Sequence, residues 1–391
     1  MISAGGLARF LEPPRLRTIE EADGERRATW LELFVDLVFV VAVGQVAVQL
    51  KDHHDALGFV EFGALFVPVW WAWVGFTFYA DRYDTDDLVF RVAMFAEMFA
   101  VAALASTTHG AFHGGSSGFA VSYFAVRAVL VTLYLRAYRA VPETRPLTRR
   151  YSAAFGFAAS LWLVSLLVPT PARYAVWGIA LAIDLGTPLR SRRVMENAPI
   201  SPSHIPERIG LFTLIVLGES VIAVVAGTFD THWNAHALVA AVGGFLAACA
   251  IWWIYFDTLD TSLFKRGFVS GQIYLYTHLP LLAGLAAAGA GVQLMIVDSA
   301  QGTFGAGARS AFCGGLAVCL ASMAVIQFAS TRTPRERDFW LRLGVAAGIV
   351  VVAATGAPVT VVVPVVVCLL AVLVVAELGH EEHRSQPEGG V

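Results

Sequence analysis

Long apolar runs are the feature that most constrains this chain. About twelve stretches of roughly 20 apolar residues follow one another, which is the length that an α-helix needs to cross the hydrocarbon core of a bilayer. Hydrophobic residues make up 57% of the 391 residues and charged residues only 15%, against about 25% charged residues in a typical soluble domain. The sequence therefore predicts an all-α polytopic membrane protein whose main partner is the lipid bilayer.

The predicted membrane-spanning helices cover residues 30–50, 57–80, 88–108, 118–138, 151–169, 173–189, 205–227, 234–256, 271–296, 308–330, 338–355 and 357–378. Only the short segment 355–359 separates the last two, so one span or two can form there. The four cysteines lie inside apolar runs without CxxC spacing, and the histidines of the loops lack the spacing of zinc ligands. No disulfide, metal site or cofactor is predicted.

Basic residues are distributed unequally between the loops on the two sides of the predicted membrane. The loops of one side hold only Lys51, Arg173 and Arg309, whereas the other side includes the leader 1–29 and the arginine-rich segments 136–150, 190–193 and 331–337. Short loops rich in Lys and Arg stay in the cytoplasm. Both termini are therefore predicted to be cytoplasmic, and the number of spans is even. The leader lacks the apolar core of a signal peptide.

Similar polar patterns recur in the two halves of the chain. A helix that carries acidic residues opens each half, a tryptophan pair follows in the next span, and Glu97 and His278 stand at similar distances after these pairs. This recurrence favours two parallel six-helix repeats, although tryptophan-rich apolar helices can also resemble one another by chance. The predicted division is a leader 1–29, a first half 30–190, a linker 191–204, a second half 205–378 and a tail 379–391.

Charged and titratable residues interrupt several of the apolar runs. A charge at the centre of a bilayer costs about 2.5–3.5 kcal/mol on insertion scales, so such residues mark a functional site or a structural pair. The candidates for a polar interior are Glu32, Asp36, Glu97, Arg127, Glu207, Arg208, Glu219, Asp257 and His278.

Two of these candidates, Glu32 and Asp36, are four residues apart and share one helix face. Two interpretations of Asp36 stay open: it belongs to a proton or cation site, or it pairs with a basic residue such as Arg208 and locks the helix bundle. Glu97 and Arg127 lie at similar depths in consecutive antiparallel spans. This arrangement predicts a buried ion pair between them, because an unpaired arginine at that depth would be very costly.

The second half carries its own candidates. Glu219 lies beside Gly218 and about 18 Å from Glu207 along the helix axis, which places it near the centre of the bilayer, where a protonatable carboxylate suits proton coupling. His278 fits either a proton relay or a hydrogen-bonded interior histidine. Asp257 lies at the end of its span, where an interfacial anchor is the simpler interpretation.

Four segments carry a resemblance to a known family. They are ELFVDLVFV (32–40), YADRYDTDD (79–87), HIPERIGLFTLIVLGES (204–220) and WWIYFD (252–257), and together they resemble the bacterial low temperature requirement A (LtrA) family. Val35 and Ile209 depart from the residues usual in that family, at apolar packing positions. The resemblance implies a multi-pass protein of the bacterial plasma membrane that is linked to growth in the cold, and it implies no settled chemistry.

The residues favour a transporter or channel that moves a proton, a monovalent cation or a small solute past the buried acids. A membrane-embedded enzyme that acts on lipid, or a non-catalytic stress-related scaffold, is the alternative. The sequence lacks P-loop, GxGxxG, HExxH and GxSxG patterns, so the usual sites of soluble enzymes have no counterpart. The net charge of −3 gives no basis for nucleic-acid binding.

Overall fold

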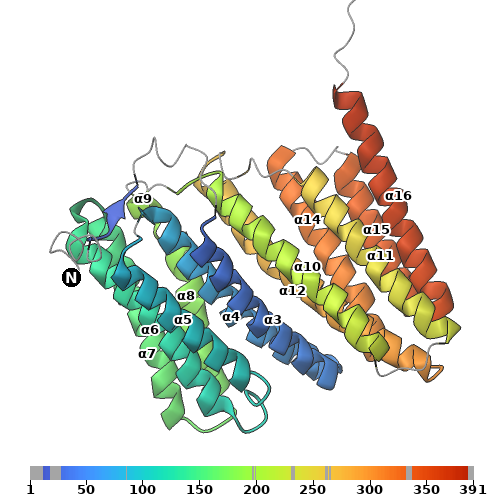
Figure 1. Cartoon of the computed structure of the whole chain (residues 1–391), viewed down its shortest axis with the longest axis horizontal. Coiled ribbons are helices and arrows are strands. Elements are labelled where there is room, and N and C mark those ends of the chain that lie inside the picture. The colour runs from blue at the N-terminus through green and yellow to red at the C-terminus, as the bar shows by residue number, and fades with distance from the viewer. Residues whose placement is uncertain are drawn as a thin grey trace, which may run out of the picture. The chain divides into compact units, whose positions relative to one another are not determined.

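The computed structural model describes residues 12–17, 28–84, 86–195, 198, 200–229, 234–259, 263, 266–331 and 337–385. These residues are almost entirely helical (Figure 1), apart from one antiparallel ribbon in which β1 (Arg15–Leu16) pairs with β2 (Tyr83–Asp84). Most of the predicted leader and parts of the predicted linker and tail lie outside the described residues. The all-helical architecture confirms the all-α part of the predicted fold class.

The helices divide between two compact units. Unit 1 comprises Met1–Val46 and Ala64–Phe212, and unit 2 comprises Ala47–Gly63 and Thr213–Val391. The helices of unit 1 are α5 (Leu88–Thr107), α6 (Ser116–Ala140), α7 (Arg145–Val164), α8 (Ala172–Leu189) and the short α9 (Arg192–Met195). Those of unit 2 are α11 (Ala235–Thr258), α12 (Phe268–Ala300), α13 (Ala306–Arg309), the π-helical turn η4 (Ser310–Gly314), α14 (Gly315–Thr331), α15 (Arg337–Ala354) and α16 (Val359–Ser385). Helices α3 (Trp30–Asp52), α4 (Ala56–Arg82) and α10 (His204–Phe229) contribute residues to both units.

Ten helices of the described residues are long and apolar enough to cross a membrane. They coincide with ten of the predicted spans. The other two predicted spans, 173–189 and 338–355, correspond to α8 and α15, which have 18 residues each and are not among the ten. The count of twelve, the repeat and the cytoplasmic termini therefore stay predictions. The last apolar region forms two helices, and the turn between them places Gly356 at φ 68°, which glycine adopts without strain.

The segment 136–150, predicted as a loop because of its arginines, is mostly helical. Helix α6 continues to Ala140 and α7 begins at Arg145, with the 3-10 turn η1 (Pro142–Thr144) between them. Proline favours this arrangement, because its missing N–H would have no partner in the first turn of a helix anyway. The charges in this segment therefore lie on helix ends.

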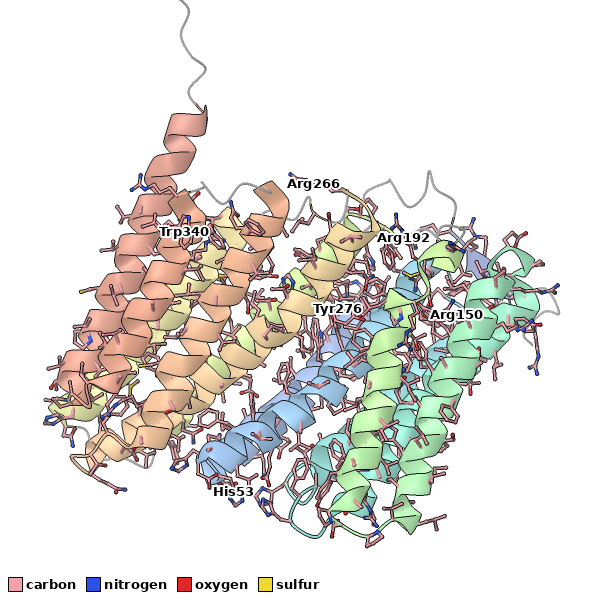
Figure 2. All side chains as sticks on the ribbon, turned by 180° about the vertical axis from the view of Figure 1, so that it is seen from behind. His53, Arg150, Arg192, Arg266, Tyr276 and Trp340 are labelled. Carbon is pink, nitrogen blue, oxygen red and sulfur yellow. The ribbon has the colours of Figure 1, made fainter. Side chains whose placement is uncertain are left out.

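Apolar side chains cover the outer surfaces of the helices as well as the interiors of the units. Phe99 is 79% exposed and Phe229 is 84% exposed, and Trp340 projects from the first turn of α15 (Figure 2). Such surfaces would be unusual in a soluble monomer but suit contact with lipid. Together with the ten apolar helices, they describe a multi-pass membrane protein.

Candidate functional site

The first turn of α3 is built by a capping box, which fixes the position of Glu32. The hydroxyl of Thr29 accepts a hydrogen bond from the backbone N–H of Glu32 at 3.2 Å, and the Glu32 carboxylate accepts one from the backbone N–H of Thr29 at 2.8 Å. This reciprocal pairing satisfies N–H groups that have no partner inside the helix. Glu32 is only 3% exposed, so the local sequence TWLE directs a carboxylate into unit 1.

Replacing Thr29 by Ala should therefore loosen this carboxylate. Loss of a capping side chain costs about 1 kcal/mol of stability. Thr29→Ser should retain most of this stability because the hydroxyl remains. Chemical denaturation in detergent micelles measures the free energy of unfolding of both variants. Equal stability of Thr29→Ala and the wild type would show that the capping box does not hold the start of α3.

One turn further along α3, Asp36 forms a buried ion pair with Arg208 of α10. Its Oδ1 lies 2.5 Å from Nη2 of Arg208 and also accepts a hydrogen bond from the indole N–H of Trp73 at 2.7 Å. Nη1 of the same guanidinium lies 3.1 Å from Oε1 of Glu32. Arg208 therefore holds these two carboxylates of α3, and the interpretation in which Asp36 pairs with Arg208 is confirmed. Charge-assisted contacts of this kind are the strong ones in a low-dielectric interior.

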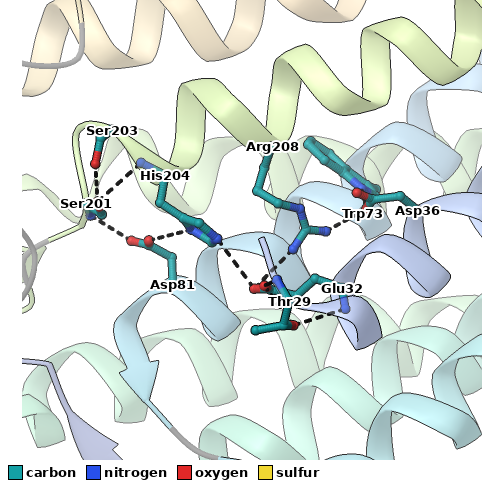
Figure 3. Close-up of polar contacts among 9 residues, drawn as sticks. All are labelled: Thr29, Glu32, Asp36, Trp73, Asp81, Ser201, Ser203, His204 and Arg208. Carbon is teal, nitrogen blue, oxygen red and sulfur yellow. Dashed lines mark hydrogen bonds and ion pairs between the residues drawn. The ribbon is translucent and has the colours of Figure 1, made fainter. Parts of the chain in front are cut away.

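A histidine extends this cluster toward α4. Nδ1 of His204 lies 2.9 Å from Oδ1 of Asp81, and its Nε2 lies 3.6 Å from Oε1 of Glu32. The second oxygen of Asp81 accepts from the backbone N–H of Ser201 at 2.8 Å, and the Ser201 hydroxyl accepts from the backbone N–H of His204 at the start of α10. Figure 3 shows the resulting line of side chains. We call Asp81, His204, Glu32, Arg208 and Asp36 the acidic cluster.

Glu97 of α5 lies within electrostatic range of Arg208 and Asp36. It is fully buried, and neither of its carboxylate oxygens has a hydrogen-bond partner among the described residues. Burying a carboxylate without donors is costly unless it binds a proton or lies beside a positive charge. Glu97 is thus an acid held next to the cluster without a fixed partner of its own.

A cavity of about 350 Å³ reaches the acidic cluster at Glu32. Its wall includes Thr29, Glu32 and Tyr83, and its rim carries Asp86 and Arg91. The Arg91 guanidinium donates two hydrogen bonds to the Asp86 carboxylate, at 2.6 and 2.7 Å, and these bonds hold the pKa of Asp86 below its ordinary value. The lining of the cavity thus combines an exposed ion pair with a buried carboxylate.

The predicted pair between Glu97 and Arg127 is not formed. Arg127 of α6 instead lies 2.8 Å from Asp184 of α8, with both side chains fully buried, and its guanidinium packs 4.6 Å from the ring of Phe155. Similar depth did not identify the partner, because it leaves the direction of each side chain around its helix undetermined. Asp87 caps α5 and pairs with Arg136 at 2.6 Å.

The remaining candidates are not part of the acidic cluster. Glu207 is exposed in the first turn of α10, where a negative charge suits the positive end of the helix dipole. Asp257 is exposed at the end of α11. His278 is buried in unit 2, where its ring nitrogens lie 2.7 Å from the Tyr274 carbonyl and 3.0 Å from the Tyr255 hydroxyl. This geometry matches the interpretation of a hydrogen-bonded interior histidine.

Glu219 also belongs to unit 2, where it is half-buried and within electrostatic range of Lys51. Nζ of Lys51 donates to Oε1 of Gln293 at 2.7 Å. A transport path that joins the acids of the cluster with Glu219 and His278 stays a prediction.

Sequence reasoning missed several buried charged or titratable residues. Asp81 and His204 stood inside the quoted segments YADRYDTDD and HIPERIGLF, but neither was selected as a site residue, although a histidine at the start of an apolar helix was a usable signal. Asp184 was overlooked within its span. A second buried pair, Arg342 with Glu377 at 2.7 Å in unit 2, was also missed. Among the described residues, no three His, Cys, Asp or Glu side chains converge to hold a metal ion.

Comparison with known proteins gives two findings. The family model described as bacterial low temperature requirement A protein (LtrA) matches residues 27–376. An uncharacterized protein of Rhizobium meliloti (strain 1021), RA0937, is 28% identical over 284 residues, which cover 68% of this chain and 69% of that protein. The residues that the family model matches include the acidic cluster, Glu97 and the cavity.

Proposed function

Since this chain belongs to the bacterial low temperature requirement A family and is a multi-pass membrane protein, we propose that it is a proton-linked or cation-linked transporter or channel of the bacterial cell membrane. In this proposal, the acidic cluster and Glu97 form the site where the proton or cation binds. The cavity beside Glu32 is the route by which it arrives from one side.

The observation that carries the proposal is the position of Glu97. It is a fully buried carboxylate without a hydrogen-bond partner among the described residues, and it lies within range of an arginine that already holds two other acids. Ionisable groups inside a membrane commonly serve proton relays and ion pathways. A carboxylate that no neighbour fixes in its ionised form can gain and lose a proton as its surroundings change.

A proton suits the cluster better than a metal ion does. The guanidinium of Arg208 already contacts both Glu32 and Asp36, so it occupies the place between these carboxylates that a metal cation would take. The line from Asp81 through His204 to Glu32 places a histidine, the side chain most often used as a proton shuttle, between two carboxylates. A proton could therefore move along the cluster while Arg208 stays in place.

The test is a flux measurement on purified protein in liposomes that contain a pH-sensitive dye, with imposed gradients of H⁺, K⁺ or Na⁺. We expect Glu97→Gln to lower the proton-linked flux at least about tenfold, because removal of one essential proton-transfer group commonly costs about 10²–10⁴ in rate. Glu97→Asp should retain part of the flux.

The matched control is Glu207→Gln, which removes an exposed acid from the first turn of α10 and should leave the flux unchanged. Size-exclusion chromatography confirms that each variant is folded. Flux that persists in Glu97→Gln would remove Glu97 from the path. If the folded wild type showed no flux under any of the three gradients, the transport function itself would be contradicted.

A further inference from the structure

Unit 2 contains an apolar groove that the acidic cluster does not explain. Its volume is about 680 Å³, and its walls come from α4, α12 and the segment from α13 to α14. Phe59, Phe62, Ala283, Ala287 and Val318 supply most of the apolar lining, and the polar side chains in the lining are His54, Asp55 and Ser310. A volume of this size and a mainly apolar lining with few polar groups are typical of small-molecule sites.

The groove exists because the backbones of α12 and α14 lie close together and few side chains fill the space beside them. A Cβ atom added to Gly284 would lie 2.6 Å from the carbonyl oxygen of Gly315, so only glycine allows this approach. The π-helical turn η4 ends at Gly314 beside this contact, and π-helical turns occur frequently at functional sites. Gly63 and Gly314 line the groove and have no atom within 4 Å of an added Cβ.

The nature of the lining decides what can fill the groove. The three helices that line it are among the ten that can cross a membrane, while His54 and Asp55 lie in the connection before α4. Water would find few hydrogen-bond partners along the apolar walls. Hydrocarbon would gain close contacts there, and a lipid chain is the hydrocarbon that surrounds a membrane helix.

We propose that one acyl chain of a membrane phospholipid occupies this groove, with the headgroup at the end formed by His54, Asp55 and Ser310. The chain fills the space beside Gly63 and Gly314, and the polar end meets the charged and hydroxyl groups found among the described residues of the lining. The Asp55 carboxylate complements the ammonium of an ethanolamine headgroup, which makes phosphatidylethanolamine the probe of choice. The groove is thus a lipid site whose lining includes none of the candidate transport residues.

The test compares two substitutions that place the same side chain in different surroundings. Gly314→Leu puts an isobutyl group into the groove without a clash at Cβ, whereas Gly344→Leu does the same on α15, where an added Cβ also has no atom within 4 Å. The proteins are purified in mild detergent with phosphatidylethanolamine, and bound lipids are counted by native mass spectrometry. We expect one phospholipid on the wild type and on Gly344→Leu, and at least about tenfold less of that species on Gly314→Leu.

A second measurement locates the lipid. Phosphatidylethanolamine with a diazirine in one acyl chain should crosslink to peptides that contain residues 59–63, 283–287 or 314–318 of the wild type, and Gly63→Leu should suppress these products. Equal lipid retention by Gly314→Leu and Gly344→Leu would overturn the proposal. Crosslinks that fall only outside these three peptides would overturn it as well.

Discussion

Arg208→Met should lower the free energy of unfolding by about 3–5 kcal/mol, which is the usual cost of removing one partner from a buried ion pair. The guanidinium contacts Glu32 and Asp36, and these carboxylates are only 3% and 0% exposed. Without it, two acids of one helix face remain buried beside each other. A loss of this size is a large part of the total stability of a typical protein, so poor yield of folded protein is the expected phenotype.

Titration with sodium dodecyl sulfate in mixed micelles, followed by tryptophan fluorescence, measures this loss. Arg208→Lys should fall between the wild type and Arg208→Met, because one ammonium cannot reproduce the two separate contacts of the planar guanidinium. The neighbouring Glu207→Gln is the matched control, since a change at an exposed position usually stays within about 0.5 kcal/mol.

Neutralising the acids as well should recover stability. In the triple variant Arg208→Met, Glu32→Gln, Asp36→Asn, neither side chain that contacted the arginine carries a charge, so the penalty of the single substitution should largely disappear. If the triple variant were as unstable as Arg208→Met, packing of the arginine stem, rather than charge balance, would explain the loss.

The fold was predictable because the length of each apolar run can be read directly from the sequence. A run of about 20 apolar residues has few alternatives to a membrane helix, and ten such helices coincide with predicted spans. The two predicted spans that fall short, α8 and α15, carry internal polar residues such as Asp184 and Arg342. Segment 136–150 was misjudged because its arginines suggested a loop, whereas Pro142 and Pro146 open helical turns there.

The site was predictable only in part, because the direction of a side chain around its helix depends on how the helices pack. The pair between Asp36 and Arg208 could be proposed because they are opposite charges near the start of two apolar helices. For Arg127 the sequence predicted Glu97 from its similar depth and overlooked Asp184, and helical periodicity alone could not reveal the partner that the structure shows. The contacts show that α7 packs against both α6 and α8, which brings Asp184 within reach of Arg127.

The pair of Arg127 and Asp184 leads to the second large expected effect: Asp184→Ala should destabilise the protein by about 3–5 kcal/mol. Both side chains are fully buried, and Nε and Nη1 of Arg127 have no hydrogen-bond partner among the described residues. In the described structure, Asp184 thus supplies the only carboxylate contact of this guanidinium. The guanidinium also contacts the ring of Phe155. Removal of Asp184 leaves a positive charge buried without a counter-charge.

Two further variants separate charge from packing. Asp184→Asn keeps an acceptor oxygen for Nη2 of Arg127 and should cost less than Asp184→Ala, because the hydrogen bond survives while the charge is lost. The double variant Arg127→Leu, Asp184→Leu removes both charged groups together and should regain most of the lost stability, since buried ion pairs can be exchanged for apolar side chains at little cost. A double variant as unstable as Asp184→Ala would contradict this account. The same detergent titration measures the stability of these variants.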